Sequence, residues 1–129
     1  MSTSDARPTL FDQWLPAEYA ERGDFTALVV LVGIGGTSID LLRSTFLNVI
    51  GDETRWREIR QLFESSGASW DGAAFFPVNS FFRGPVPNDV ARSELRELEE
   101  KLREDRRLLN DGHFFDRKGR RMKVEEILH

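Results

Sequence analysis

The chain contains no cysteine and only two histidines, His113 and the final residue His129. Without thiols it forms neither a disulfide-stabilised scaffold nor a cysteine zinc site, and thiol catalysis is excluded. The metal-binding spacing Asp-x-Asp and the nucleophile motif Gly-x-Ser-x-Gly are also missing. We therefore assign no catalytic residue, no metal ligand and no cofactor from the sequence. His113 has two interpretations: a turn residue after a helix, or a base oriented by Asp111 or Asp116.

No part of the chain is uniformly apolar over the ~20 residues that a membrane helix needs. The most apolar stretch, 27–51, contains Asp40, Arg43, Asn48 and a pair of glycines. The N-terminus has no basic segment followed by an apolar one, so we predict no signal peptide. We therefore expect a cytoplasmic chain without membrane partners.

An excess of basic charge is also missing. The chain has 18 Lys and Arg against 22 Asp and Glu, a net charge of −4. A weakly acidic chain is not a general nucleic-acid binder. The basic cluster from Arg117 to Lys123 has no Tyr or Trp for base stacking. It predicts at most weak nucleic-acid binding; a charged edge hairpin or a contact with an acidic protein is the alternative.

The 129 residues are enough for one domain with its own core. We expect residues 1–8 to form a mobile tail and residues 9–129 to form a single domain. Apolar periodicity and capping residues predict five helices, with Pro16 separating the first two. The expected helical ranges are 10–15, 16–22, 38–50, 52–66 and 88–110.

Two β-favouring runs stand between the expected helices. The continuous apolar run 27–32 predicts a strand buried on both faces, and 72–78 predicts a second strand. Because two helices are expected between them, we predict a crossover between parallel strands. Residues 114–124 predict a hairpin whose loop needs Gly119 in the left-handed conformation. The fold class is α+β, a small mixed sheet of three to four strands covered by helices, in the order αα-β-αα-β-α-ββ.

A glycine-rich segment follows the first expected strand. Gly33 to Gly36 connect this strand to the expected helix 38–50, and a helix N-terminus can bind a phosphate. The candidate anion-binding residues are Gly35, Gly36, Thr37 and Ser38. The segment lacks the lysine of a phosphate-binding loop, so a tight structural turn competes with this interpretation. A small phosphate- or nucleotide-handling enzyme built on this loop is our alternative function.

Phenylalanine is concentrated in one segment, with four of the chain's ten between positions 75 and 82. Alternation along a central strand explains the first pair, Phe75 and Phe76. Phe81 and Phe82 fall in an expected loop beyond Pro77. They either fill the edge of the core or form a recognition patch.

The long helix 88–110 has a narrow apolar stripe that includes Leu95 and Leu102. The stripe indicates either a solvated helix lying on the sheet or a dimer seam, which Asp105 would interrupt. Our leading prediction is a non-enzymatic protein-interaction module: an adaptor, an inhibitor-type partner or an assembly subunit. It would bind a protein partner, or a second copy as a homo-oligomer. The predicted partner-binding residues are Phe81, Phe82, Arg83, Leu95 and Leu102.

Overall fold

The computed structural model describes residues 8–81 and 83–124. The predicted tail, apart from Pro8, and Phe82 lie outside the described residues. In chain order the elements are α1 (Leu10–Arg22), β1 (Phe25–Gly35), β2 (Ser38–Val49), α2 (Trp56–Glu64), β3 (Gly72–Val78), α3 (Asn88–Glu104), the 3₁₀ helix η2 (Arg106–Asp111) and β4 (His113–Asp116). The four strands form one sheet in the order β2-β1-β3-β4, and every neighbouring pair is antiparallel.

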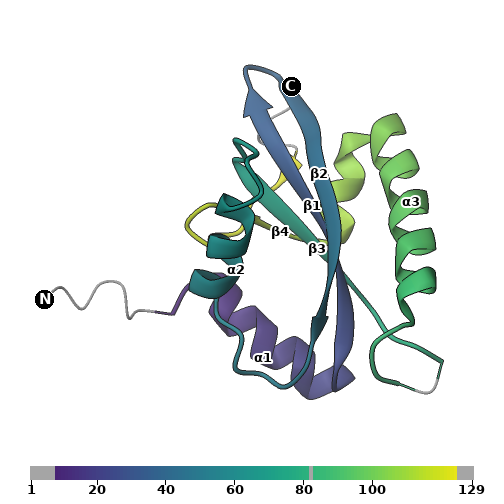
Figure 1. The fold of residues 1–129 in the computed structure, drawn as a ribbon. Helices are drawn as coiled ribbons and strands as arrows, with labels where there is room; N and C mark the ends of the chain where they lie inside the picture. The colour runs from purple at the N-terminus through teal and green to yellow at the C-terminus, as the bar shows by residue number, and fades with distance from the viewer. Residues whose placement is uncertain (1–7, 82, 125–129) are drawn as a thin grey trace, which may run out of the picture.

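The sheet has a helical layer on each face (Figure 1). Helices α1 and α2 pack on one face, which we call the α1–α2 face, and α3 and η2 pack on the other, the α3 face. Strand β1 is the shared centre, because Val29 contributes to the first cluster while Val30 and Val32 contribute to the second. The predicted burial of β1 on both faces is confirmed.

The predicted α+β class is confirmed, but two parts of the prediction were wrong. Residues 38–50 do not form a helix, because β2 occupies Ser38–Val49. The predicted parallel crossover is wrong as well, since β1 and β3 are antiparallel neighbours. Both errors have one origin: the chain turns back at Gly36 in a hairpin, where φ is 56°. Glycine adopts this left-handed conformation without a steric penalty.

A β-bulge explains why β2 resembles a helix in the sequence. Arg43 pairs with Leu31 and Leu41 pairs with Val32, so Leu42 is an extra residue in the ladder. The bulge breaks the two-residue alternation of apolar side chains, which normally identifies a strand. The remaining apolar spacing then fits a helical period equally well.

The other elements differ from the prediction in several places. The predicted hairpin 114–124 keeps only its first strand, β4, and its second strand is reduced in the described residues to a single bridge between Phe115 and Arg121. One helix, α1, runs through Pro16, because burial of Phe11, Trp14 and Leu15 outweighs the single hydrogen bond that proline removes. Helix α3 ends at Glu104 rather than near residue 110, since Asp105 is extended and caps η2. Gly119 has a φ of 75°, so its predicted left-handed conformation is confirmed.

Within residues 8–81 and 83–124, no helix combines the length and the apolar character needed to cross a membrane.

Candidate functional site

The glycine-rich segment forms the tip of the β1–β2 hairpin. Gly35, Gly36, Thr37 and Ser38 are all exposed, and the Ser38 hydroxyl donates to the Gly35 carbonyl at 3.0 Å. No helix begins here, because β2 starts at Ser38. The predicted helix N-terminus was therefore wrong, and the alternative enzyme function loses the dipole on which its anion site depended.

The loop after β3 presents an aromatic side chain to solvent. We call residues 79–81, 83 and 84 the aromatic loop, since Phe82 lies outside the described residues. Phe81 is 93% exposed, so it does not fill the core. The loop is closed by main-chain hydrogen bonds: Arg83 N–H donates to Ser80 O, and Ser80 N–H donates to Gly84 O, each at 3.0 Å. Arg83 has a φ of 70°, a left-handed conformation that is uncommon for a residue other than glycine.

Asn79 joins the aromatic loop to two other segments at this end of the sheet. Its side-chain nitrogen donates to Asp24 O at 3.0 Å, and its side-chain oxygen accepts from Arg22 Nη1 at 3.0 Å. The Asp24 carboxylate in turn accepts from Gly51 N–H at 3.0 Å. Ile50, beside that glycine, is 63% exposed. Three chain segments therefore hold two exposed apolar side chains at one end of the molecule.

A shallow hollow of about 410 Å³ adjoins the aromatic loop. It is lined by Tyr19, Ala20, Arg22, Gly23, Asp24, Arg83 and Gly84. The hollow gives this end of the sheet a concave area beside Arg83.

The apolar stripe of α3 faces the sheet. Leu102 is fully buried in the α3-face cluster, and Leu98 packs against that cluster. Leu102 is therefore a core residue, and its assignment to a partner-binding surface was wrong. Leu95 is half-buried on the same helix. The stripe covers the sheet, as the solvated-helix interpretation predicts.

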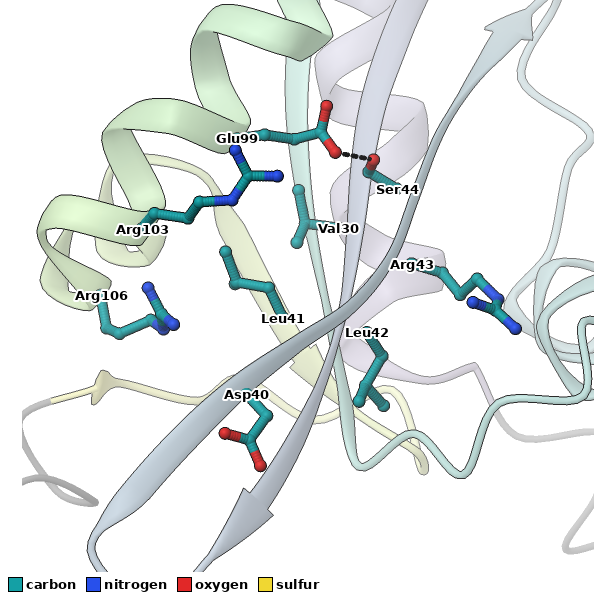
Figure 2. A pocket seen from close by; sticks show the side chains of 9 residues that line it. All are labelled: Val30, Asp40, Leu41, Leu42, Arg43, Ser44, Glu99, Arg103 and Arg106. Atoms are coloured by element: carbon teal, nitrogen blue, oxygen red, sulfur yellow. Dashed lines mark hydrogen bonds between the residues drawn. The ribbon is translucent and has the colours of Figure 1, made fainter.

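A second concave surface, which we call the edge groove, lies between β2 and α3. It has a volume of about 570 Å³. Its lining residues are Val30, Asp40, Leu41, Leu42, Arg43, Ser44, Glu99, Arg103 and Arg106, as Figure 2 shows. The sequence does not predict this groove, because residues 38–50 were expected to form a helix and no strand edge was expected there.

Three of the polar groups in the edge groove are engaged in hydrogen bonds. The Ser44 hydroxyl donates to Glu99 Oε2 at 2.8 Å, and Arg106 Nε donates to the Ile39 carbonyl at 2.8 Å. A second Arg106 nitrogen donates to the Leu102 carbonyl. Arg103, on α3, makes no hydrogen bond or ion pair with the described residues (Figure 2). Arg43 also makes no such bond among the described residues, but its side chain points away from α3, so Arg103 is the unengaged guanidinium on the α3 side of the groove (Figure 2).

His113 lies in a polar cluster against α1. Its ring packs on Trp14 with centroids 4.6 Å apart, Nε2 is 3.7 Å from Glu18 Oε1, and Nδ1 is 3.0 Å from Arg121 Nη1. Burial lowers the pKa of His113, and the charges of Arg121 and Arg22 lower it further, against the opposing effect of Glu18. Because Arg121 donates to Nδ1, we assign the proton of the neutral ring to Nε2.

This arrangement does not support His113 as a base. A general base needs a free ring nitrogen, and both nitrogens face protein groups. The predicted partner Asp116 is engaged elsewhere, since it accepts from Lys118 N–H at 2.8 Å and from Arg120 Nε at 2.7 Å.

The arginines of the basic hairpin are engaged within the chain. Arg117 binds both oxygens of Glu64, at 2.8 and 3.0 Å, and lowers the pKa of that carboxyl. Its guanidinium also lies 5.3 Å from the centre of the Trp70 ring. Arg121 lies 4.7 Å from the ring of Phe115. These contacts favour the charged-hairpin interpretation, although nucleic-acid binding stays an untested prediction.

The described residues contain no group of three or more histidine, aspartate or glutamate side chains arranged to hold a metal ion. Comparison of the chain with protein-family models, with curated proteins and with solved structures finds no match. The two surfaces from which a function can be inferred are the aromatic loop and the edge groove.

Proposed function

We propose that this chain is a non-enzymatic protein-interaction module that docks a protein partner, or a second copy of itself, through the aromatic loop. An adaptor, an inhibitor-type partner and an assembly subunit are the roles that fit. The observation that supports the proposal is the 93% exposure of Phe81 on a loop closed by hydrogen bonds.

The energetics of an exposed aromatic residue favour docking. Phenylalanine removes a large apolar area from water when a partner covers it, and aromatic and arginine side chains are enriched at interfaces. Arg83 follows two positions after Phe81 and is also exposed. Asn79 and Ser80 already hold the loop backbone, so little conformational entropy is lost on binding.

The two candidates for catalysis in the sequence were the glycine-rich segment and His113. Their geometry favours a non-enzymatic role. The hairpin tip has no helix dipole to bind a phosphate, and both nitrogens of His113 face protein groups. Neither feature provides a nucleophile or a free base.

The test compares three alanine variants. Phe81→Ala should change the free energy of unfolding by less than about 0.5 kcal/mol. Phe115→Ala, in the core, should lower it by about 3–5 kcal/mol. Leu62→Ala is the matched surface control, because Leu62 is 49% exposed on α2, away from the aromatic loop. Urea unfolding measures these differences.

Association is measured on the same variants. Sedimentation velocity across protein concentrations detects self-association, and quantitative affinity capture detects partners. We expect Phe81→Ala to weaken the association by about 2 kcal/mol, or roughly 30-fold, while Leu62→Ala leaves it unchanged. The proposal is wrong if Phe81→Ala is as destabilising as Phe115→Ala. It is also wrong if Phe81→Ala associates and captures as the natural chain does.

A further inference from the structure

Strand β2 is a long sheet edge. It has 12 residues and pairs with β1 on one side, and within the described chain no strand pairs with its other side. The opposite edge, β4, has only four residues, and Arg121 forms a bridge with its Phe115. Proteins usually shorten or cover such edges, because their open main-chain groups can pair with another strand.

Two hydrogen bonds of Asp71 show which main-chain groups of β2 are open. Ile34 N–H donates to Asp71 Oδ2 at 2.7 Å, and Val32 O accepts from Asp71 N–H at 2.8 Å. The main-chain groups of Val32 and Ile34 therefore face β3 and not β2. Strand alternation gives the same direction to Val30 and Leu28.

In an antiparallel pair of strands, the N–H and C=O groups of two opposite residues either bond to one another or both point away from the partner strand. The residues of β2 opposite these four are Ile39, Leu41, Ser44 and Phe46. Their N–H and C=O groups therefore point outward from the sheet. Arg106 bonds to the carbonyl of Ile39, which leaves Leu41, Ser44 and Phe46 open. The bulge at Leu42 separates the first two, so a strand that pairs here must be irregular opposite Leu42.

The edge groove lies directly beside this open stretch. Leu41, Ser44 and Val30 line it from the sheet, and Glu99 and Arg103 line it from α3. Figure 2 shows the side chain of Arg43 pointing away from α3, to the other face of the sheet. The Glu99 carboxylate accepts from Ser44, whereas Arg103 has no such partner among the described residues. The groove is therefore suited to one additional negative charge.

We propose that an extended segment of a partner protein adds to β2 as a fifth strand along 41–46, with an acidic side chain that pairs with Arg103. Side chains directly opposite each other on paired strands lie on the same face. A ligand residue opposite Leu41 therefore points toward α3, where Arg103 lies. Main-chain hydrogen bonds would give affinity, and the arginine would select the acidic residue. This site uses none of the aromatic loop and goes beyond the proposed function.

A second copy of the chain fits this groove less well. A pairing between two β2 strands would place the α3-face residues of one copy in the groove of the other. None of those residues is acidic: they are Ile39, Leu41, Ser44, Phe46 and Asn48. Asp40, between two residues of the α3-face cluster, belongs to the opposite face by strand alternation. The charge of Arg103 thus favours an acidic segment from another protein.

The probe is a library of random nonapeptides displayed on phage and selected on the full-length chain. We expect the enriched peptides to share one acidic position within a β-favouring sequence. A synthetic peptide of the enriched sequence should bind about tenfold more tightly than its Glu→Gln or Asp→Asn form. Arg103→Glu should weaken binding of the acidic peptide at least tenfold. The same variant should instead bind a peptide that has lysine at the acidic position.

Two further variants test the strand pairing itself. Ser44→Pro removes an N–H that points outward and should therefore abolish peptide binding. An edge strand tolerates proline at such a position, so the chain should still fold. Ser44→Ala keeps the N–H and removes only the hydroxyl that holds Glu99, so Ser44→Pro should bind much more weakly than Ser44→Ala. Phe81→Ala should bind normally, because the aromatic loop is not involved. In the complex, the amide hydrogens of Leu41, Ser44 and Phe46 should exchange with solvent more slowly than in the free chain. If Ser44→Pro does not fold, the arginine variant and amide exchange still decide.

Three results would overturn the proposal. The first is that selection on the natural chain enriches no acidic position relative to the same selection on the Arg103→Glu variant. The second is peptide binding that is insensitive to Arg103→Glu and leaves the three amides unprotected. The third is amides that are already protected in the free chain and lose protection on dilution, because a second copy would then occupy the edge.

Discussion

Asp12 holds the starts of two helices with one carboxylate. One of its oxygens accepts from Thr9 N–H at 3.1 Å, which completes the capping box of α1. The other accepts from Trp56 N–H at 2.7 Å, at the first residue of α2. The N-cap residue of α2, Arg55, makes no side-chain capping bond of its own. One residue therefore fixes the relative position of both helices on the α1–α2 face.

His113 should make the stability of the fold depend on pH. The folded state lowers its pKa below the ordinary value of about 6.5, mainly through burial and also through Arg121 and Arg22, against Glu18. Between the folded and unfolded pKa values, the unfolded chain binds more protons. The free energy of unfolding should therefore fall as the pH drops below about 6.5, and level off once the folded histidine is protonated.

The measurement is urea unfolding between about pH 5.5 and pH 7.5, where the ordinary carboxyl groups stay ionised. We expect His113→Gln to flatten the pH dependence and His129→Gln, the control at the other histidine, to retain it. An unchanged slope in His113→Gln would contradict the assignment.

The sequence predicts the helices and strands that a local pattern of residues specifies. It does not predict those whose recognition depends on which strands pair. The apolar run of β1 needs no knowledge of its neighbours, and Pro87 sets the start of α3 directly. Strand β2 failed because the bulge at Leu42 removes the alternation that identifies a strand. With β2 assigned to a helix, the hairpin at Gly36 could not be recognised.

The same limit applies to the two candidate surfaces. The exposure of Phe81 follows from its place in a loop, which the sequence indicates through Pro77 and Gly84. The burial of Leu102 follows from the sheet face that α3 covers, and the sequence does not specify that face. The edge groove requires β2 and α3 to be neighbours, so it was visible only in the structure.

Adjacent residues of β2 should respond very differently to proline. Thr45 pairs with Val29 and directs its N–H toward β1, whereas the N–H of Ser44 points outward. We expect Thr45→Pro to destabilise the fold by about 1–3 kcal/mol more than Ser44→Pro, because it leaves a buried carbonyl unpaired. Ser44→Ala and Thr45→Ala correct for the lost hydroxyl groups in the same urea titrations. Equal losses would show that the orientation derived for β2 is wrong.

Across the whole molecule, the tryptophans occupy one side of the sheet. Trp14, Trp56 and Trp70 all belong to the cluster of the α1–α2 face. The α3 face is built on Val30, Val32 and Leu102 among others, and it contains no tryptophan in its described cluster. Tryptophan fluorescence therefore reports on one face, while helical circular dichroism also includes α3.

We expect both faces to unfold together, because they share β1. Leu102→Ala removes a fully buried side chain from the α3 face and should cost about 2–5 kcal/mol. The fluorescence transition, although it reports the far face, should shift by the same amount as the circular dichroism transition. A fluorescence midpoint that stays in place while the dichroism splits into two steps would show independent faces.

The bulge in β2 also has a consequence for chain length. Twelve residues of β2 lie against eleven of β1, and Leu42 is the residue without a partner. A chain lacking Leu42 keeps every remaining pair between the two strands, and Leu41 and Arg43 then alternate as in a regular strand. The loss is limited to the packing of one leucine beside Gly33. Deletion of a residue away from the bulge, such as Phe46, would instead shift the side chains between it and the bulge to the wrong face. Leu41 and Leu42 are identical residues, and Leu42 can take the place of Arg43 opposite Leu31. Among sequences that share this fold, a one-residue gap in β2 is therefore expected within positions 41–43 and not elsewhere in the strand.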